Sequence, residues 1–172
     1  MAWKDQTMTE ITVRRLGEAD VEAWRELRLE ALERHPEAFG SPLVAEAAQP
    51  LGFFADRIAR GPIWGAFSGM EMVGSVGFFV CDGAKRKHKG VLWGLYVREA
   101  VRGSAAAGAL VEAVLDHARG TVEVVQLSVD ADNRRACRFY DRMGFLAYGL
   151  ERHALKVGGR YHDEELRARF LT

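Results

Sequence analysis

The sequence predicts an α+β fold built on a single mixed sheet in which most strands are antiparallel. Two hairpin patterns, one in the first half of the chain and one at its end, predict antiparallel pairs. Between them lie an apolar strand at 90–97, a helix and a β-branched strand at 121–129. A strand–helix–strand unit of this kind is parallel and right-handed. The expected sheet therefore contains one parallel crossover flanked by hairpins.

The first third of the chain predicts one strand followed by helices. Residues 11–16 alternate apolar and polar side chains, as a half-buried strand does. Residues 20–34 repeat apolar side chains at helical spacing, with Asp20 in a position to cap the helix. A loop over 37–42 leads to further helical sequence, in which 50–60 is a short amphipathic helix.

The middle of the chain predicts a hairpin and then the central strand. Residues 63–67 and 72–80 are strand-like and are joined by a turn at 68–69. The polar and basic segment 82–89 predicts a second turn. Residues 90–97 are almost continuously apolar, which is typical of a strand covered on both faces.

The last third of the chain completes the crossover and adds a closing hairpin. The helix after the central strand ends near Arg119, and 121–129 is rich in valine, as strands are. A short helix follows over about 133–143. The strands 145–155 and 164–170 then surround a glycine-containing turn, which predicts the second hairpin.

Composition excludes several classes of protein. The 172 residues, 48% of them hydrophobic, suit one domain over the whole chain, with 1–9 expected to be a flexible tail. Lys plus Arg and Asp plus Glu each number 24, so no basic surface for nucleic acid or an anionic membrane is expected. Cys81 and Cys137 are too few for a disulfide framework and lack metal-ligand spacing. The sequence contains no apolar stretch long enough to span a membrane and no signal-peptide pattern. The default prediction is therefore a cytoplasmic protein that binds no metal.

Two loops are expected at the carboxyl edge of the parallel pair, where open sheets bind ligands. The first, Arg102–Ala107, offers a guanidinium and the unpaired amides of a helix start, which suit a pyrophosphate. Its small side chains suit close helix–sheet packing equally well. In the second loop, Asn133 is an N-cap or a ligand-binding amide. Tyr140 carries a hydroxyl whose partner is either protein or substrate.

Two segments resemble the Gcn5-related N-acetyltransferase (GNAT) family, namely GLYVREAVRGSAAAGALVEAV and LSVDADNRRACRFYDRMGF. Arg102 and Ala107 match the family pattern Arg/Gln-x-x-Gly-x-Gly/Ala. The residues that match the second family block, in order, are Asn133, Ala136, Tyr140, Gly144 and Phe145. Ala105 replaces the middle glycine, and its methyl group either displaces a pyrophosphate or is accommodated at a negative φ. The resemblance extends over nearly the whole chain.

The resemblance implies a three-layer α/β/α, acyl-CoA N-acyltransferase fold with acetyl-CoA between the splayed parallel strands. It implies that the amide of Val97 polarises the thioester carbonyl and that Tyr140 protonates the departing thiolate. The implied cofactor contacts are Leu95, Tyr96, Val97, Arg102, Gly103, Ser104, Ala105, Ala106, Ala107, Gly108, Asn133, Ala136 and Tyr140. The implied reaction is direct attack by a small-molecule primary amine in a ternary complex. A homodimer is also implied.

The acceptor amine must lose a proton, because a free alkylamine has a pKa of about 10. Candidate bases are His88 and Glu123, although His88 also suits a solvated turn and Glu123 a surface strand. Cys137 is better explained by packing than as an acyl-carrying nucleophile. The resemblance implies acceptor contacts from residues that also suit the core or rim, namely Phe39, Ser41, Trp64, Phe79 and Tyr161.

Two alternative functions stay open. A non-catalytic acyl-CoA-binding or regulatory domain would keep the fold without chemistry, and Ala105 together with the lack of an evident base favours it. Transfer to a protein N-terminus or a lysine would need an open groove with an acidic lining.

Overall fold

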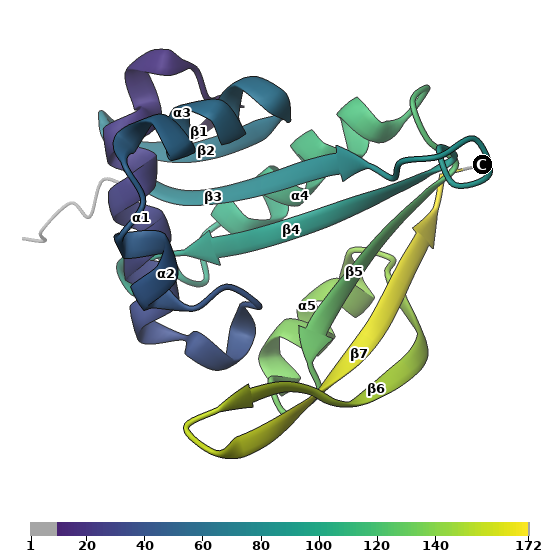
Figure 1. Ribbon diagram of the computed structural model, residues 1–172. Coiled ribbons are helices and arrows are strands. Elements are labelled where there is room, and N and C mark those ends of the chain that lie inside the picture. The colour runs from purple at the N-terminus through teal and green to yellow at the C-terminus, as the bar shows by residue number, and fades with distance from the viewer. Residues whose placement is uncertain (1–9, 172) are drawn as a thin grey trace, which may run out of the picture.

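A seven-stranded sheet lies between two layers of helices in the computed structural model, which describes residues 10–171 (Figure 1). The strands are β1 (Ile11–Arg15), β2 (Ile63–Ser68), β3 (Glu71–Val80), β4 (Lys89–Val97), β5 (Val124–Asp130), β6 (Leu146–Val157) and β7 (Arg160–Phe170). The α-helices are α1 (Val21–Arg34), α2 (Leu43–Ala47), α3 (Leu51–Arg60), α4 (Ala106–Ala118) and α5 (Arg134–Arg142). The 3-10 turns are η1 (Glu18–Asp20), η2 (Pro36–Ala38) and η3 (Glu99–Val101). The tail predicted at 1–9 lies outside the described residues.

The strand order is β1-β2-β3-β4-β5-β7-β6, and every neighbouring pair is antiparallel except β4 and β5. This arrangement confirms the predicted α+β fold with one mixed, mostly antiparallel sheet. In the described part of the chain, no helix is both long and apolar enough to cross a membrane.

Alternation along the strands produces the two apolar layers on either side of the sheet. In β2, Ile63 and Phe67 pack on the face that holds Trp24 of α1, together with α3. Trp64 and Ala66 point to the other face and pack with α4 and α5. The three-layer architecture follows, with α1 and α3 on one side of the sheet and α4 and α5 on the other (Figure 1).

Three local details differ from the prediction. Asp20 does not cap α1, because its carboxylate binds the guanidinium of Arg14 at 2.8 Å. β5 begins three residues later than expected, because the amide of Val122 donates to the carbonyl of Ala118 (3.0 Å) and prolongs the end of α4. β7 begins four residues earlier, since its ladder with β6 continues to the Val157–Arg160 pair.

The parallel strands β4 and β5 pair over a short distance and then separate (Figure 1). Their ladder runs only from Lys89↔Val124 to Val91↔Gln126. Beyond it, β5 stays paired with β7, whereas β4 follows β3 through a register shift beside Gly94, whose φ is +65°. An extra residue in one strand bends that strand and raises its twist. The last residues of β4 therefore have no β5 partner.

Candidate active site

A cavity of about 650 Å³, here called the first cavity, opens along the part of β4 that β5 leaves. Its walls come from the end of β4, the loop into α4, one side of α5 along its length and the chain around η2. All the predicted cofactor-binding residues line it except Ala106 and Tyr140. The separation of two strands thus brings both sequence blocks to one cavity.

The start of α4 presents amides to the first cavity. The first intrahelical bond runs from the amide of Ala109 to the carbonyl of Ala105 (2.9 Å), so within this helix the amides of Ala107 and Gly108 have no acceptor. The hydroxyl of Ser104 accepts from the amide of Ala106 (3.2 Å) and caps the turn. With the positive end of the helix dipole, these amides fit an anion such as a pyrophosphate.

The backbone of the loop tolerates the alanine that replaces the family glycine. Ala105 has a φ of −70°, a conformation open to any L-residue, so its methyl group causes no backbone strain. Gly103, in contrast, has a φ of +88°, which favours glycine. The glycine that the conformation requires is therefore present.

The guanidinium of Arg102 lies at the rim of the first cavity. One terminal nitrogen lies 2.7 Å from Nε2 of His35, and the other binds the carboxylate of Glu99 at 3.0 Å. Arg102 thus joins the loop before α4 to the end of α1, the helix that His35 follows.

The end of the central strand forms one wall of the first cavity, and its side chains pack toward the two apolar layers, Tyr96 on one side and Leu95 and Val97 on the other. Tyr96 is 5% exposed and packs in the core beneath α1, where its hydroxyl donates to Glu30 (2.8 Å). Burial, together with this carboxylate, raises the pKa of Tyr96 to about 12. The side chain is therefore neutral, and β4 offers peptide groups at Leu95 and Val97.

A second cavity of about 500 Å³ lies between η2, the end of β5 and the β6–β7 hairpin. Its lining residues are Glu37, Asp130, Asp132, Asn133, Val157, Arg160 and His162. Asn133 also lines the first cavity, and η2 gives Ala38 to the first and Glu37 to the second. The two cavities therefore adjoin.

The match to a known family covers most of the chain. A family model described as the acetyltransferase (GNAT) family matches residues 21–145. The chain belongs to the GNAT family of acetyltransferases. GNAT enzymes use acetyl-CoA as their co-substrate.

Solved structures share this GNAT fold at low sequence identity. A GNAT-family acetyltransferase from Streptococcus pneumoniae is 17% identical, with a TM-score of 0.84 and coverage of 94% of this chain and 100% of that one. A ribosomal-protein-alanine N-acetyltransferase from Brucella melitensis is 20% identical, with a TM-score of 0.76 and coverages of 93% and 99%. Arabidopsis thaliana NAA60, solved with acetyl-CoA, is 21% identical, with a TM-score of 0.71 and coverages of 94% and 99%. Among curated protein sequences, none matches this chain significantly.

Tyr140 of this acetyltransferase lies behind the wall of the first cavity. Its ring packs edge-on against Phe139 and Phe145, and the residue is 7% exposed. Its α5 neighbours Ala136, Phe139 and Met143 line the cavity, whereas Tyr140 does not. Burial raises the pKa of Tyr140 well above its ordinary value, so the phenol keeps its proton.

The two predicted bases lie at the other end of the GNAT sheet. The amide of Glu123 donates to the carbonyl of His88 (2.8 Å) just before Lys89, where β4 and β5 still pair. The first cavity is lined by Leu95 to Val97, at the opposite end of β4. The structure therefore does not bring His88 and Glu123 to the first cavity, because both precede their strands.

Most of the predicted acceptor contacts lie outside both cavities. Phe39 lines the first cavity. Trp64 is 8% exposed and packs against His117 of α4, and Phe79 is 48% exposed on β3 opposite Val91, at the far end of the sheet.

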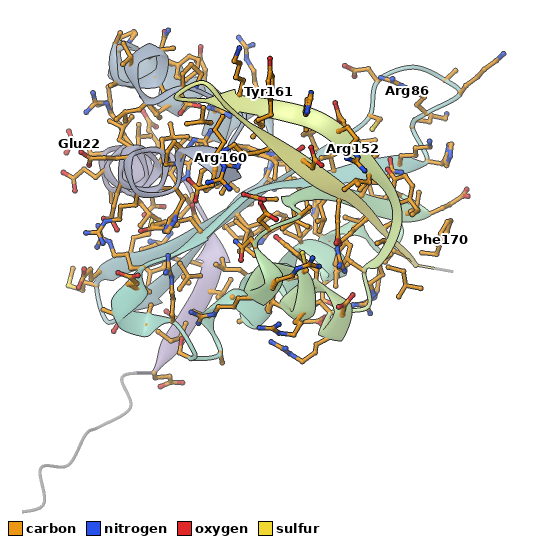
Figure 2. The ribbon with its side chains drawn as sticks, turned by 90° about the horizontal axis from the view of Figure 1, so that it is seen from below. Glu22, Arg86, Arg152, Arg160, Tyr161 and Phe170 are labelled. Atoms are coloured by element: carbon orange, nitrogen blue, oxygen red, sulfur yellow. The ribbon has the colours of Figure 1, made fainter. Side chains whose placement is uncertain are left out.

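The remaining two predicted acceptor contacts are engaged elsewhere. Ser41 lies near Glu46 and helps to lower the pKa of that carboxyl. Tyr161 stacks on His153, with ring centres 4.2 Å apart. Figure 2 shows Arg160 and Tyr161 leaving the hairpin on opposite sides, as neighbouring strand residues do.

Apart from Asn133, sequence reasoning missed the polar residues of the second cavity. Asp130 ends the apolar strand β5 and Asp132 follows it, so both carried a visible signal for the carboxyl end of that strand. His162 carried none, because only the closing hairpin brings it to the end of β5.

Proposed function

We propose that this acetyltransferase transfers the acetyl group of acetyl-CoA to the primary amine of a small molecule, in a ternary complex. The main support for the proposal is that Asn133 lines both cavities, so that the two adjoin. The first follows the free edge of β4 to the start of α4 and suits acetyl-CoA. The second is lined mostly by polar side chains and suits an acceptor.

In this proposal the peptide groups of Leu95 and Val97 pair with the pantetheine arm as a missing strand would. The Arg102–Gly108 loop receives the pyrophosphate, supported by its free helix-start amides and by the side chain of Arg102. The amide of Val97 polarises the thioester carbonyl. Ala106 is fully buried and its amide already binds Ser104, so it supports the loop from behind.

The transfer forms a nitrogen–carbon bond and breaks the carbon–sulfur bond. Tyr140 gives its hydroxyl proton to the leaving sulfur and regains a proton from the nitrogen, so the amine proton ends on the thiol. Burial raises the pKa of Tyr140, so the donor is protonated before the reaction. No covalent enzyme intermediate is formed.

The charges of the second cavity favour a cationic acceptor. Glu37, Asp130 and Asp132 outnumber the single permanent cation, Arg160. A volume of about 500 Å³ is in the range of small-molecule sites. Small primary amines, which are ammonium ions near neutral pH, fit both properties.

The test measures binding and turnover separately. Acetyl-CoA should raise the melting temperature of the full chain, because a ligand of the folded state stabilises it. Release of CoA thiol is then followed with ethylamine, ethanolamine, 1,4-diaminobutane and phenethylamine. Turnover with at least one of these amines is expected.

Two other outcomes select the alternatives. Stabilisation by acetyl-CoA without turnover of any amine or peptide selects the non-catalytic acyl-CoA-binding domain. Turnover of peptides above that of the small amines selects a protein acceptor, which is the kind of acceptor that the name of the Brucella melitensis ribosomal-protein-alanine N-acetyltransferase describes for that protein.

A further inference from the structure

We propose that His162, held by Asp130, is the base that deprotonates the acceptor ammonium in the second cavity. This inference rests on the proposed function. An alkylammonium ion has a pKa of about 10 and cannot attack a thioester until it loses a proton. Histidine side chains exchange protons near neutral pH, which suits this task.

The two side chains form a buried pair across neighbouring strands. Nδ1 of His162 lies 3.6 Å from Oδ2 of Asp130, with the side chains 13% and 7% exposed. The other carboxylate oxygen of Asp130 accepts from the amide of Asp132 (2.9 Å), which fixes the carboxylate plane. Because Nδ1 faces the carboxylate, Nε2 on the opposite side of the ring is the atom that takes the proton.

The strand ladders hold the pair in place. Asp130 is the last residue of β5 and pairs with Glu164 of β7, two residues beyond His162. The amide of Ala131 donates to the carbonyl of Asp163 (2.9 Å), and His162 pairs with Leu155 of β6. The base therefore lies on a paired strand, beside the register shift that β6 makes between Glu151 and Leu155.

The groups around His162 suit an ammonium ion. Glu37 from η2, Asp130 at the end of β5, Asp132 after it and Arg160 from β7 line the cavity with it. The carboxylates outnumber the arginine, so they attract a cation, and Asp130 is placed to stabilise the imidazolium that forms.

The proton balance is complete without another reactant. Nε2 of His162 takes one proton from the ammonium nitrogen, and the imidazolium, paired with Asp130, releases it to solvent. The neutral nitrogen then attacks the thioester, and its second proton reaches sulfur through Tyr140. Asp130 is a positioning residue, because it acts only through the imidazole.

The test replaces His162 by Gln and follows the most active amine of the panel from about pH 7 to pH 9. At pH 7 the variant should turn over about 100-fold more slowly than the wild type, within the range of general-base effects. The deficit should then shrink by up to tenfold per pH unit, because the fraction of free amine rises that much below its pKa of about 10. Asp130→Asn should show a smaller deficit with the same trend.

A matched control is His153→Asn. His153 lies on the same hairpin but outside both cavities, and its φ of +54° is a conformation that asparagine tolerates. This variant should follow the wild type at every pH. Acetyl-CoA should raise the melting temperature of all the variants as it does for the wild type.

The outcomes separate the two proposals. A wild type that acetylates an amine, with an equally active H162Q, overturns the role of His162 and leaves the proposed function standing. If the turnover of H162Q is lower than that of the wild type by the same factor at every pH, the role of His162 is also overturned. A merely structural defect would lower turnover without any dependence on the fraction of free amine. A wild type that acetylates no amine overturns the proposed function and this inference together.

Discussion

Tyr140 shows how a core position can prepare a reactive group. Its ring packs against Phe139 and Phe145, and burial raises its pKa by penalising the phenolate. The same burial removes it from the lining of the first cavity, which its neighbours on α5 form. In the proposed reaction, only the hydroxyl end of the ring is therefore expected to reach the leaving sulfur.

Replacing Tyr140 by Phe should lower turnover by about 100-fold or more, since general-acid catalysis contributes factors of that size. The edge-on ring contacts survive the change, so the increase in melting temperature with acetyl-CoA should be unchanged. Steady-state turnover and thermal denaturation measure the two effects. An unaltered rate would remove Tyr140 from the acid role.

The start of α4 is the element on which the proposed cofactor site depends. Ser104 caps the helix by accepting from Ala106, and the amides that follow have no intrahelical acceptor. A negative charge in this first turn should stabilise the helix through its dipole, but it should repel a bound diphosphate.

The Ala105→Asp variant should therefore separate stability from binding. The free protein is expected to gain about 0.3–1 kcal/mol from the helix dipole, while its affinity for acetyl-CoA falls at least tenfold. Urea unfolding and titration calorimetry measure the two quantities. Ala105→Asn, similar in size but uncharged, is the control and should bind almost normally. Equal binding by both variants would place the pyrophosphate elsewhere.

At the scale of the whole molecule, a buried ionic network holds the helical layer over the bent part of β4. Arg28 of α1 binds both oxygens of Glu46 in α2, at 3.0 and 2.8 Å, and Arg57 of α3 binds one of them at 3.2 Å. The guanidinium of Arg57 lies 4.7 Å from the ring of Trp93, and that of Arg28 lies 5.3 Å from Phe39. The network thus joins three helices to the strand and to one wall of the first cavity.

Stability should fall in acid partly through this network. Burial raises the pKa of Glu46, but the hydrogen bonds and charge of Arg28, with help from Ser41 and Arg57, outweigh it and hold the pKa below its usual value. A depressed carboxyl pKa gives stability above the unfolded value of about 4.3, which is lost as the pH falls through the folded pKa.

The Glu46→Gln variant should cost about 3 kcal/mol near neutral pH, because it leaves the buried Arg28 and the half-buried Arg57 without their anion. Urea unfolding between about pH 3 and pH 7 measures both effects. The variant should show a smaller loss of stability in acid than the wild type. If the stability of the variant and that of the wild type fell equally with pH, carboxylates other than Glu46 would dominate the loss of stability in acid.

Local patterns in the sequence determined the elements and the chemistry of the first cavity. The alternating and helical periods reflect which side chains can reach a common core, and the small residues after Arg102 predicted a helix start that can face an anion. Gly94, isolated in an apolar strand, also carried a signal for the bulge that separates β4 from β5.

Tertiary structure alone decided which distant residues meet. His88 and Glu123 precede their strands, so the direction of β4 and β5 takes them away from the cavities. His162 reaches Asp130 because β7 inserts between β5 and β6. The physical reason is that the order of strands in a sheet depends on non-local packing and pairing, which no short sequence pattern records.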